Sequence, residues 1–202
     1  NLESSSISSH SVVGGITATP ISRTTLNFSP TLRMSYKPQR GTELRLDYFG
    51  RSFAPTNEQL APVQDVTNPL ISYVGNQDLL PGFQHNLFGR FSKYWTKTQT
   101  SLSVFGRAQV VQRDIIQRSL YDVTTGKRTI DYTNVDGNAS VGIGGFLTQT
   151  LPGKKFSIRV ASFNDLARSN TYINGDKNRS LALRLREELG LNYRVTGIDM
   201  TL

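Results

Sequence analysis

The chain of 202 residues contains no cysteine, only two histidines and no long apolar run. The missing cysteines exclude a disulfide scaffold and any thiolate-bound zinc or iron–sulfur site. No stretch of about 18 apolar residues occurs, which excludes a transmembrane helix. The hydrophobic fraction is low, at 37%, but 17 glycines bring the composition back toward that of a folded chain.

Positive charge exceeds negative charge, with 23 Lys+Arg against 15 Asp+Glu and a formal net charge of +8. Such a balance permits an anionic partner but does not identify one. Nucleic-acid binding requires basic and aromatic residues gathered on one patch. Here the charges are distributed over every predicted strand, so we expect no nucleic-acid partner.

The chain begins at Asn1 without a basic or apolar leader and ends at Leu202 inside an alternating segment. We therefore expect both ends to be cuts through a longer protein. Residues 1–24 are rich in Ser, Thr and Gly and predict a loop or surface connection. Residues 25–202 predict one β domain.

Apolar and polar side chains alternate with a period of two after residue 25. Leu102, Val104 and Val110, for example, alternate with Ser103 and Arg107. This period predicts strands with one apolar and one polar face. A weak helical pattern over 181–191 is the one competing signal, and we favour a strand there as well. The alternating runs lie at 26–36, 44–48, 102–110, 141–147, 156–161 and 181–186.

The predicted connections alternate in length. Three are tight turns, at 37–42, 96–98 and 152–154, whereas a long Pro-rich connection spans 54–82. Hairpin ends are expected at 124–127 and 174–177. Short turns at one end and longer loops at the other are typical of outer-membrane barrels.

Aromatic residues accompany the tight turns. Barrels of this kind carry girdles of aromatic rings where membrane meets water, and we interpret these residues as one girdle. The runs at 99–121 and 128–150 also exceed the roughly 9–11 residues that a spanning strand needs. The girdle candidates are Tyr36, Tyr94, Trp95, Phe156 and Tyr193.

Residues 49–91 carry a more specific resemblance. Ser-Phe-Ala-Pro-Thr at 52–56 is followed by a Gln-Leu pair, and Gly-Asn-Gln-Asp-Leu-Leu-Pro-Gly occupies 75–82. With the Asp-Val-Thr-Asn-Pro-Leu linker at 65–70, this segment resembles the barrel domain of TonB-dependent outer-membrane receptors of the Bacteroidetes type. Leu80 and Gly82 depart from it, because Lys and Glu are usual there. The matching loop positions are Pro55, Gln59, Leu60, Asn68, Pro69, Gly75, Asn76, Asp78, Leu79 and Pro81.

The resemblance implies an all-β fold: an antiparallel up-and-down transmembrane β-barrel wall segment. The chain would supply about seven strands of a barrel of roughly 22. It also implies a bacterial outer-membrane location, with 54–82 extracellular, and a receptor for energy-coupled nutrient uptake. The expected partners are outer-membrane lipid and, through the parent chain, a plug domain and an energy-transducing inner-membrane complex. A surface lipoprotein is a further partner of such proteins.

Four arginines, Arg107, Arg159, Arg184 and Arg186, fall on the face opposite the aliphatic residues. In a barrel this face lines the lumen. We therefore predict that these side chains contact a plug domain or an anionic solute.

The sequence offers no candidate for catalysis, metal binding or cofactor binding. Gly153-Lys154-Lys155 lacks the upstream glycine and the hydroxyl of a phosphate loop. His85 has no nucleophile motif nearby, and a polar histidine near a strand start is the better interpretation. We expect a protein that is not an enzyme.

Two alternatives remain open. A soluble β-sandwich acting as a binding module would pack its aliphatic rows against a second sheet. A barrel of the same family could instead serve in a surface assembly complex, and sequence does not separate this role from transport.

Overall fold

The computed structural model describes residues 2–9, 12–13, 16–17, 21–61, 65–195 and 198–201, with side chains for 27–61, 68–194 and 200. Strands account for nearly all of it. In chain order the elements are β1 (Leu2–Ser9), β2 (Val12–Val13), β3 (Ile16–Thr17), β4 (Ile21–Phe28), β5 (Thr31–Gln39), β6 (Thr42–Phe53), α1 (Asn57–Leu60), β7 (Asp65–Asn68), β8 (Ile71–Tyr73), β9 (Gly82–Trp95), β10 (Thr100–Gln112), β11 (Asp114–Tyr121), β12 (Arg128–Val135), β13 (Asn138–Thr150), β14 (Phe156–Ile173), β15 (Asp176–Val195) and β16 (Ile198–Thr201).

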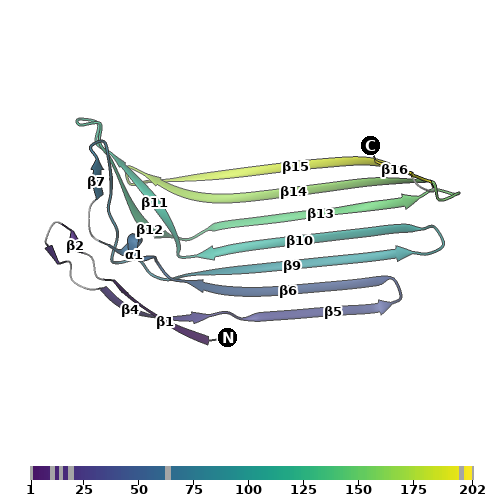
Figure 1. Cartoon of the computed structure of the whole chain (residues 1–202), viewed down its shortest axis with the longest axis horizontal. Coiled ribbons are helices and arrows are strands. Elements are labelled where there is room, and N and C mark those ends of the chain that lie inside the picture. Colours follow the sequence, from purple (N-terminus) through teal and green to yellow (C-terminus); the bar gives the residue numbers. More distant parts are fainter. Residues whose placement is uncertain are drawn as a thin grey trace.

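Seven long antiparallel strands, β5, β6, β9, β10, β13, β14 and β15, lie side by side and form what we call the wall (Figure 1). This confirms the predicted all-β wall segment. The strands β14 and β15 have 18 and 20 residues, beyond the roughly 9–11 that cross a bilayer. The segment 181–191, where a helical pattern competed, is part of β15.

The three tight turns lie at one end of the wall (Figure 1). At the other end, the turn at Asn174 and Gly175 has φ of 51° and 87°. Such left-handed pairs form two-residue hairpins, in agreement with the turn predicted at 174–177. The expected separation is therefore only partial: the connections from β6 to β9 and from β10 to β13 are long, whereas β14 and β15 are joined at that same end by a two-residue turn.

The runs at 99–121 and 128–150 are not single strands, contrary to expectation. The first breaks at Arg113, with φ of 50°, and the second at Gly137, with φ of 97°. The Arg113 amide donates to the Asp136 carboxylate at 2.7 Å, which fixes both breaks at the same level. As a result β11 and β12 pair with each other and leave the plane of the wall.

Beyond these breaks, β11 and β12 join α1 and β8 in a small folded unit, which we call the cap (residues 54–61, 68–81 and 114–135). Its core consists of Leu60, Leu79 and Tyr132, with Ile115 packed against them. The Pro-rich connection at 54–82 is therefore folded where the structure describes it, with Pro62 and Val63 outside the described residues. Its side chains Leu70 and Tyr73 are exposed.

Residues 1–24 differ from the predicted loop. Over its described part, β1 pairs with β4 along eight residue pairs, from Leu2 with Phe28 to Ser9 with Ile21. Alternation of Ser and Thr with Leu and Ile permits an extended strand, although this composition also suits a loop.

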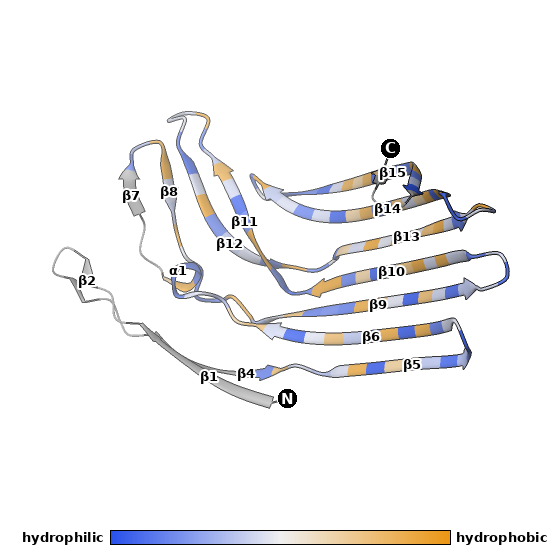
Figure 2. Ribbon diagram, turned by 45° about the vertical axis from the view of Figure 1, so that its right-hand side comes forward, coloured by the Kyte–Doolittle hydropathy of each residue, from blue (hydrophilic) through white to orange (hydrophobic). Residues whose placement is uncertain are grey.

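The wall has two chemically distinct faces, visible as alternating colours along each strand (Figure 2). Cross-strand partners share a face, and the register places Leu46, Gly89, Gly106 and Ile143 in one row. We call this side the apolar face and the opposite side the polar face. Within the described residues, no helix has the length and apolar character needed to cross a membrane.

Candidate functional site: an arginine and phenylalanine belt on the polar face

Two adjacent rows of side chains cross the polar face of the wall. Both rows follow directly from the strand register, because each member is the cross-strand partner of the next. Together they form a belt rich in arginine and phenylalanine. One row holds Arg45, Arg90, Phe105, Gly144, Phe163 and Arg186, and the other holds Arg33, Asp47, Phe88, Arg107, Gly142, Asp165 and Arg184.

The pair Arg107 and Asp165 spans three strands of the belt. Arg107 lies on β10 and Asp165 on β14, yet Arg107 Nη2 donates to Asp165 Oδ1 at 2.6 Å. The two meet above Gly142 of β13, where an added Cβ would come within 2.3 Å of Asp165 Oδ1 and 3.0 Å of Arg107 Nε. Glycine at this position is what permits the contact.

Gly144, the next residue of β13 on the polar face, has a similar arrangement, with aromatic rings in place of the ion pair. Phe105 and Phe163 meet over Gly144 with centroids 5.8 Å apart, and a Cβ on Gly144 would lie 2.8 Å from Phe163. The Arg186 guanidinium stands 5.3 Å from the Phe163 ring. Together with Phe88, these side chains line a cavity of about 410 Å³ on the polar face.

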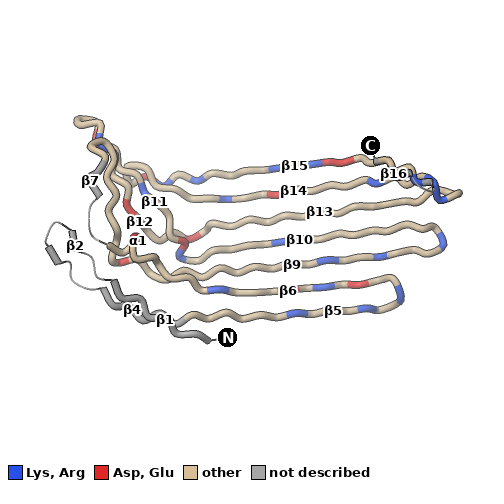
Figure 3. Tube along the Cα trace, in the orientation of Figure 1, with Lys and Arg blue, Asp and Glu red and all other residues tan. Residues whose placement is uncertain are grey.

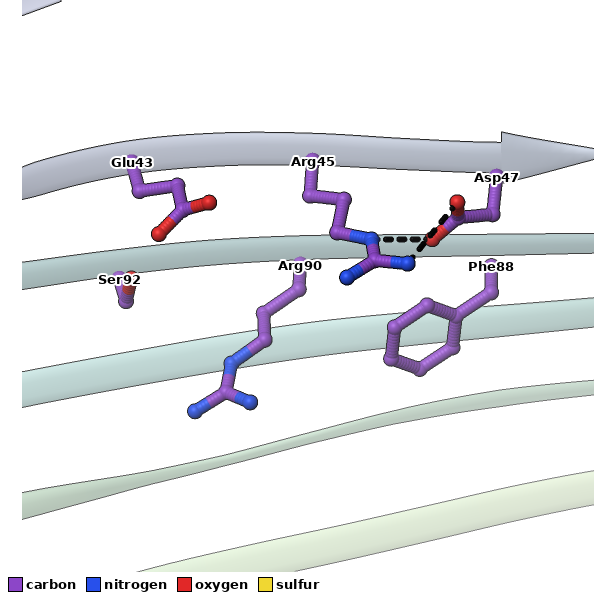
Figure 4. A pocket seen from close by; sticks show the side chains of 6 residues that line it. All are labelled: Glu43, Arg45, Asp47, Phe88, Arg90 and Ser92. Carbon is purple, nitrogen blue, oxygen red and sulfur yellow. Dashed lines mark hydrogen bonds and ion pairs between the residues drawn. The ribbon is translucent and has the colours of Figure 1, made fainter. Parts of the chain in front are cut away.

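A second cavity of about 480 Å³ lies over β6 and β9 (Figure 4). On its floor Arg45 Nε donates to Asp47 Oδ2 at 2.6 Å, and Arg33 approaches the same carboxylate at 3.6 Å. Arg90, which also lines the cavity, has no carboxylate within ion-pair distance among the described side chains. The belt therefore contains arginines with an acidic partner and arginines without one.

All four arginines predicted to line the polar face do so, but their surroundings differ. Arg107 pairs with Asp165, and Arg186 donates to Glu188 at 2.7 Å. Arg159 lies 4.2 Å above the Phe146 ring. Arg184 has no carboxylate within ion-pair distance in the described part of the chain.

The sequence alone missed most of the belt. Phe105 lies inside the predicted run at 102–110 but has no predicted role, and Phe163 and Asp165 lie beyond the predicted run at 156–161. The sequence did contain one signal for the belt, the glycines at 142 and 144, two residues apart on β13. Glycine inside a strand often marks a position where other groups approach the backbone closely. Lys and Arg are distributed along the whole wall, so charge alone did not single out the belt (Figure 3).

Four of the five predicted girdle residues face the apolar side at the turn end. Phe156 and Tyr193 are register partners with ring centroids 4.7 Å apart. Trp95 lies beneath the Lys93 amine, 4.9 Å from its ring, and Tyr36 shares a row with Leu44. Tyr94 is the exception, because its register partner Ser101 is on the polar face.

The loop motif that carries the resemblance is structural, and its two halves meet inside the cap. The Gly75 amide donates to the Ala61 carbonyl and the Asn76 amide to the Gln59 carbonyl, at 2.9 and 2.7 Å. Gln59 also forms a capping box with Thr56 at the start of α1. Leu60 and Leu79 are buried, at 3% and 1% exposed.

The remaining motif positions support this core or lie at its surface. Asn76 donates to the Tyr132 carbonyl at 2.9 Å and accepts from the Asp78 amide. Asn68 accepts from the Leu70 amide. Pro55 is buried, Pro81 half-buried, and Pro69 and Asp78 exposed.

His85 is held by a tyrosine. Its Nδ1 lies 3.0 Å from the Tyr48 hydroxyl, and its ring packs against Phe83 at 4.7 Å. In the described residues no three His, Asp or Glu side chains are grouped as metal ligands.

A sheet of long strands with an apolar face, a polar face, an aromatic girdle and tight turns at one end defines the wall of an outer-membrane β-barrel. The family model of the outer membrane protein β-barrel family matches residues 2–196, and the chain belongs to this family. Its place is the bacterial outer membrane. No curated protein is significantly similar to the chain.

The soluble β-sandwich alternative fails on the same grounds. A sandwich would bury Leu181, Leu183 and Ile143 between two sheets. These side chains are 62–69% exposed, and the family is a membrane family. The apolar face is the surface that lipid covers.

Proposed function

We propose that the chain is part of an outer-membrane receptor that imports a nutrient with energy supplied from the inner membrane. The belt is the observation that carries this proposal. A lumen wall that only closes a barrel needs polar side chains, whereas here arginines and phenylalanines are concentrated in two rows across the strands.

The resemblance of 52–82 to TonB-dependent receptors supplies the class of transport. In that class the partners are a plug domain inside the barrel and an energy-transducing complex, both reached through the parent chain. The belt would hold such a plug, or bind an anionic solute through Arg90 and Arg184, together with Arg159 on the same face nearer the turn end. The chain performs no chemistry in this proposal: the belt offers charge and aromatic surface, and its two carboxylates, Asp47 and Asp165, are paired with arginines.

The test replaces three arginines in the complete parent protein, as Arg107→Ser, Arg159→Ser and Arg184→Ser. We expect barrel assembly to stay nearly intact while solute uptake or plug retention falls about tenfold, the effect of roughly 1.4 kcal/mol of lost binding. The matched control removes three positive charges at the cap end of the molecule, away from the tight turns, as Lys127→Ser, Lys177→Ser and Arg179→Ser. This variant should leave uptake unchanged. Normal uptake with a retained plug in the triple arginine variant would contradict the proposal.

A role in a surface assembly complex is the second candidate, and the cap is the observation that favours it. The cap is a folded unit that exposes Leu70, Leu80 and Val123, the last at 93%. Such a surface suits a protein partner such as a surface lipoprotein. Loss of surface assembly on Val123→Asp, with uptake absent from the start, would favour this role over transport.

A further inference from the structure

One carboxylate stands on the apolar face of the wall. In β15 the odd-numbered residues Leu183, Leu185 and Leu189 face outward, and Glu187 falls in the same series. Its cross-strand partner is Ser162, whose hydroxyl donates to Glu187 Oε1 at 2.8 Å. Asn164 in turn donates to Ser162 Oγ at 2.9 Å.

We call Ser162, Asn164 and Glu187 the polar notch. Its surroundings are aliphatic, since Leu185 and Leu189 on either side of Glu187 are 63% and 78% exposed. No Lys, Arg or His lies within ion-pair distance of Glu187 among the described side chains. The neighbouring Glu188 points to the polar face, where Arg186 pairs with it.

The depth of the notch follows from the girdle. Glu187 is six residues along β15 from Tyr193, whose ring stacks on Phe156 at the membrane boundary. At about 3.3 Å per residue and a tilt of about 45°, this separation is roughly 14 Å along the membrane normal. An apolar band about 25 Å tall therefore has Glu187 near its middle.

A carboxylate at this depth loses its hydration without gaining a cation, and ionisable groups inside membranes are generally paired or functional. Ser162 supplies one hydrogen bond, but a hydroxyl does not neutralise the charge. The ionised form of Glu187 would therefore be stabilised by a cation from outside the described residues.

The apolar face also has two positions without side chains in the row that passes through Asn164. Gly89 and Gly106 are register partners there, on β9 and β10, and β13 lies between them and the strands of the notch. An added Cβ would have its nearest contact at 3.8 Å for Gly89 and 3.7 Å for Gly106, so packing within the chain does not demand glycine at either position.

We propose that the polar notch docks another membrane-embedded protein, which places a lysine or arginine side chain against Glu187. Charge complementarity favours a cationic side chain over lipid, because a lipid tail offers no cation and a headgroup lies too far from the middle of the bilayer. A wall strand of the parent barrel on the side of β15 where β16 pairs is the competing source of a cation, and the crosslink below distinguishes the two. The proposal is independent of the nutrient-uptake function, because it concerns the outer surface of the wall.

The test uses a photo-crosslinking amino acid at Leu185 in the complete parent protein, within native outer membranes. We expect an intermolecular adduct whose yield falls at least fivefold with Glu187→Leu and persists with Glu188→Gln, the matched control on the other face. A probe at Ala182, on the polar face, should give no such adduct. Mass spectrometry of the adduct should place a Lys or Arg of the partner beside the probe.

A charge exchange completes the test. Glu187→Lys should abolish the adduct, and Lys or Arg→Glu at the crosslinked partner position should restore it. Adducts only within the parent barrel, or an adduct that is unchanged in Glu187→Leu, would overturn the proposal. Each variant barrel should still migrate differently on SDS gels before and after heating, which shows that it is folded. Loss of the adduct is thereby distinguished from loss of folding.

Discussion

At the scale of single residues, alternation along a strand decides which substitutions the wall tolerates. Val104 and Gln109 lie on the same strand, β10, but Val104 pairs with Phe91 on the apolar face and Gln109 with Asn86 on the polar face. Substitution by arginine should therefore destabilise the barrel at Val104 and have little effect at Gln109.

We expect Val104→Arg to destabilise the barrel by about 2 kcal/mol, because it places a cation in lipid. Gln109→Arg should change stability by less than about 0.5 kcal/mol, because that position is polar already. Unfolding by urea in lipid vesicles measures both. Equal costs for the two variants would mean that the faces are wrongly assigned.

Asp122 gives the hairpin tip between β11 and β12 a defined pH dependence. The Thr125 hydroxyl donates to its carboxylate at 2.7 Å and the Thr124 amide at 2.9 Å. These hydrogen bonds, that from the Thr125 side chain first, lower the pKa of Asp122 below its ordinary value of 3.8. The folded hairpin tip therefore favours the ionised carboxylate of Asp122. The stabilisation that this carboxylate gives to the tip is fully present above pH 3.8.

This contribution should disappear as the pH falls through the lowered pKa of Asp122. Amide hydrogen exchange at Thr124 and Thr125 should be slow at about pH 6 and should accelerate, beyond the intrinsic rate change, as the pH is lowered below the ordinary value of 3.8. In Asp122→Asn one acceptor oxygen remains for the Thr124 amide, the acceptor for the Thr125 hydroxyl is lost and the titrating charge is gone, so the extra acceleration should vanish. An identical acid response in the two proteins would refute the assignment.

At the scale of elements, the cap depends on a small core fixed by a few buried side chains. Leu79 and Leu80 are adjacent in sequence, but Leu79 is 1% exposed and Leu80 is 48% exposed. Asn134 spans this segment with two hydrogen bonds to the Leu80 backbone, at 2.8 and 2.9 Å. Nearby, Arg118 pairs with Asp131, and the hydrogen bond between them raises the pKa of Arg118.

We expect Leu79→Ala to destabilise the cap by about 2–5 kcal/mol, since it leaves a cavity between Leu60 and Tyr132. Leu80→Ala should have an effect within about 0.5 kcal/mol. Hydrogen exchange should accelerate in α1 and β12 for the first variant only, with the wall strands unchanged. Exchange that accelerates throughout β13 and β14 would show that cap and wall unfold as one unit.

At the scale of the whole molecule, the two ends of the wall should lie on opposite sides of the outer membrane. The resemblance of 52–82 predicts that the cap is extracellular and that the tight turns are periplasmic. The absence of cysteine from the chain makes this directly testable with single introduced thiols.

A membrane-impermeant maleimide should label Val123→Cys in intact cells, because Val123 is 93% exposed at the hairpin tip. Lys97→Cys, in the turn between β9 and β10, should react only after the outer membrane is opened. The reverse pattern would invert the topology. Labelling of both sites after opening serves as the control that each thiol is accessible.

The sequence by itself determined where the long strands lie, which of their faces is apolar and which polar, and which connections are the tight turns at one end of the wall. These features depend on neighbours one to four residues apart, through the period of two at Leu102–Val110 and the left-handed turn at Asn174 and Gly175. It also fixed which face carries Arg107, Arg159, Arg184 and Arg186, because strand geometry alone sends successive side chains to opposite sides.

Only the tertiary structure decided which of these side chains meet. Arg107 and Asp165 are 58 residues apart and belong to strands that are not adjacent, so their contact depends on the register of β10, β13 and β14 and on the glycine between them. The bend at Arg113 and Gly137 likewise needs both strands at once, since Asp136 of one fixes the amide of the other. Alternation assigns a residue to a face, whereas the register of distant strands assigns its neighbours, and a sequence without pairing information contains only the first.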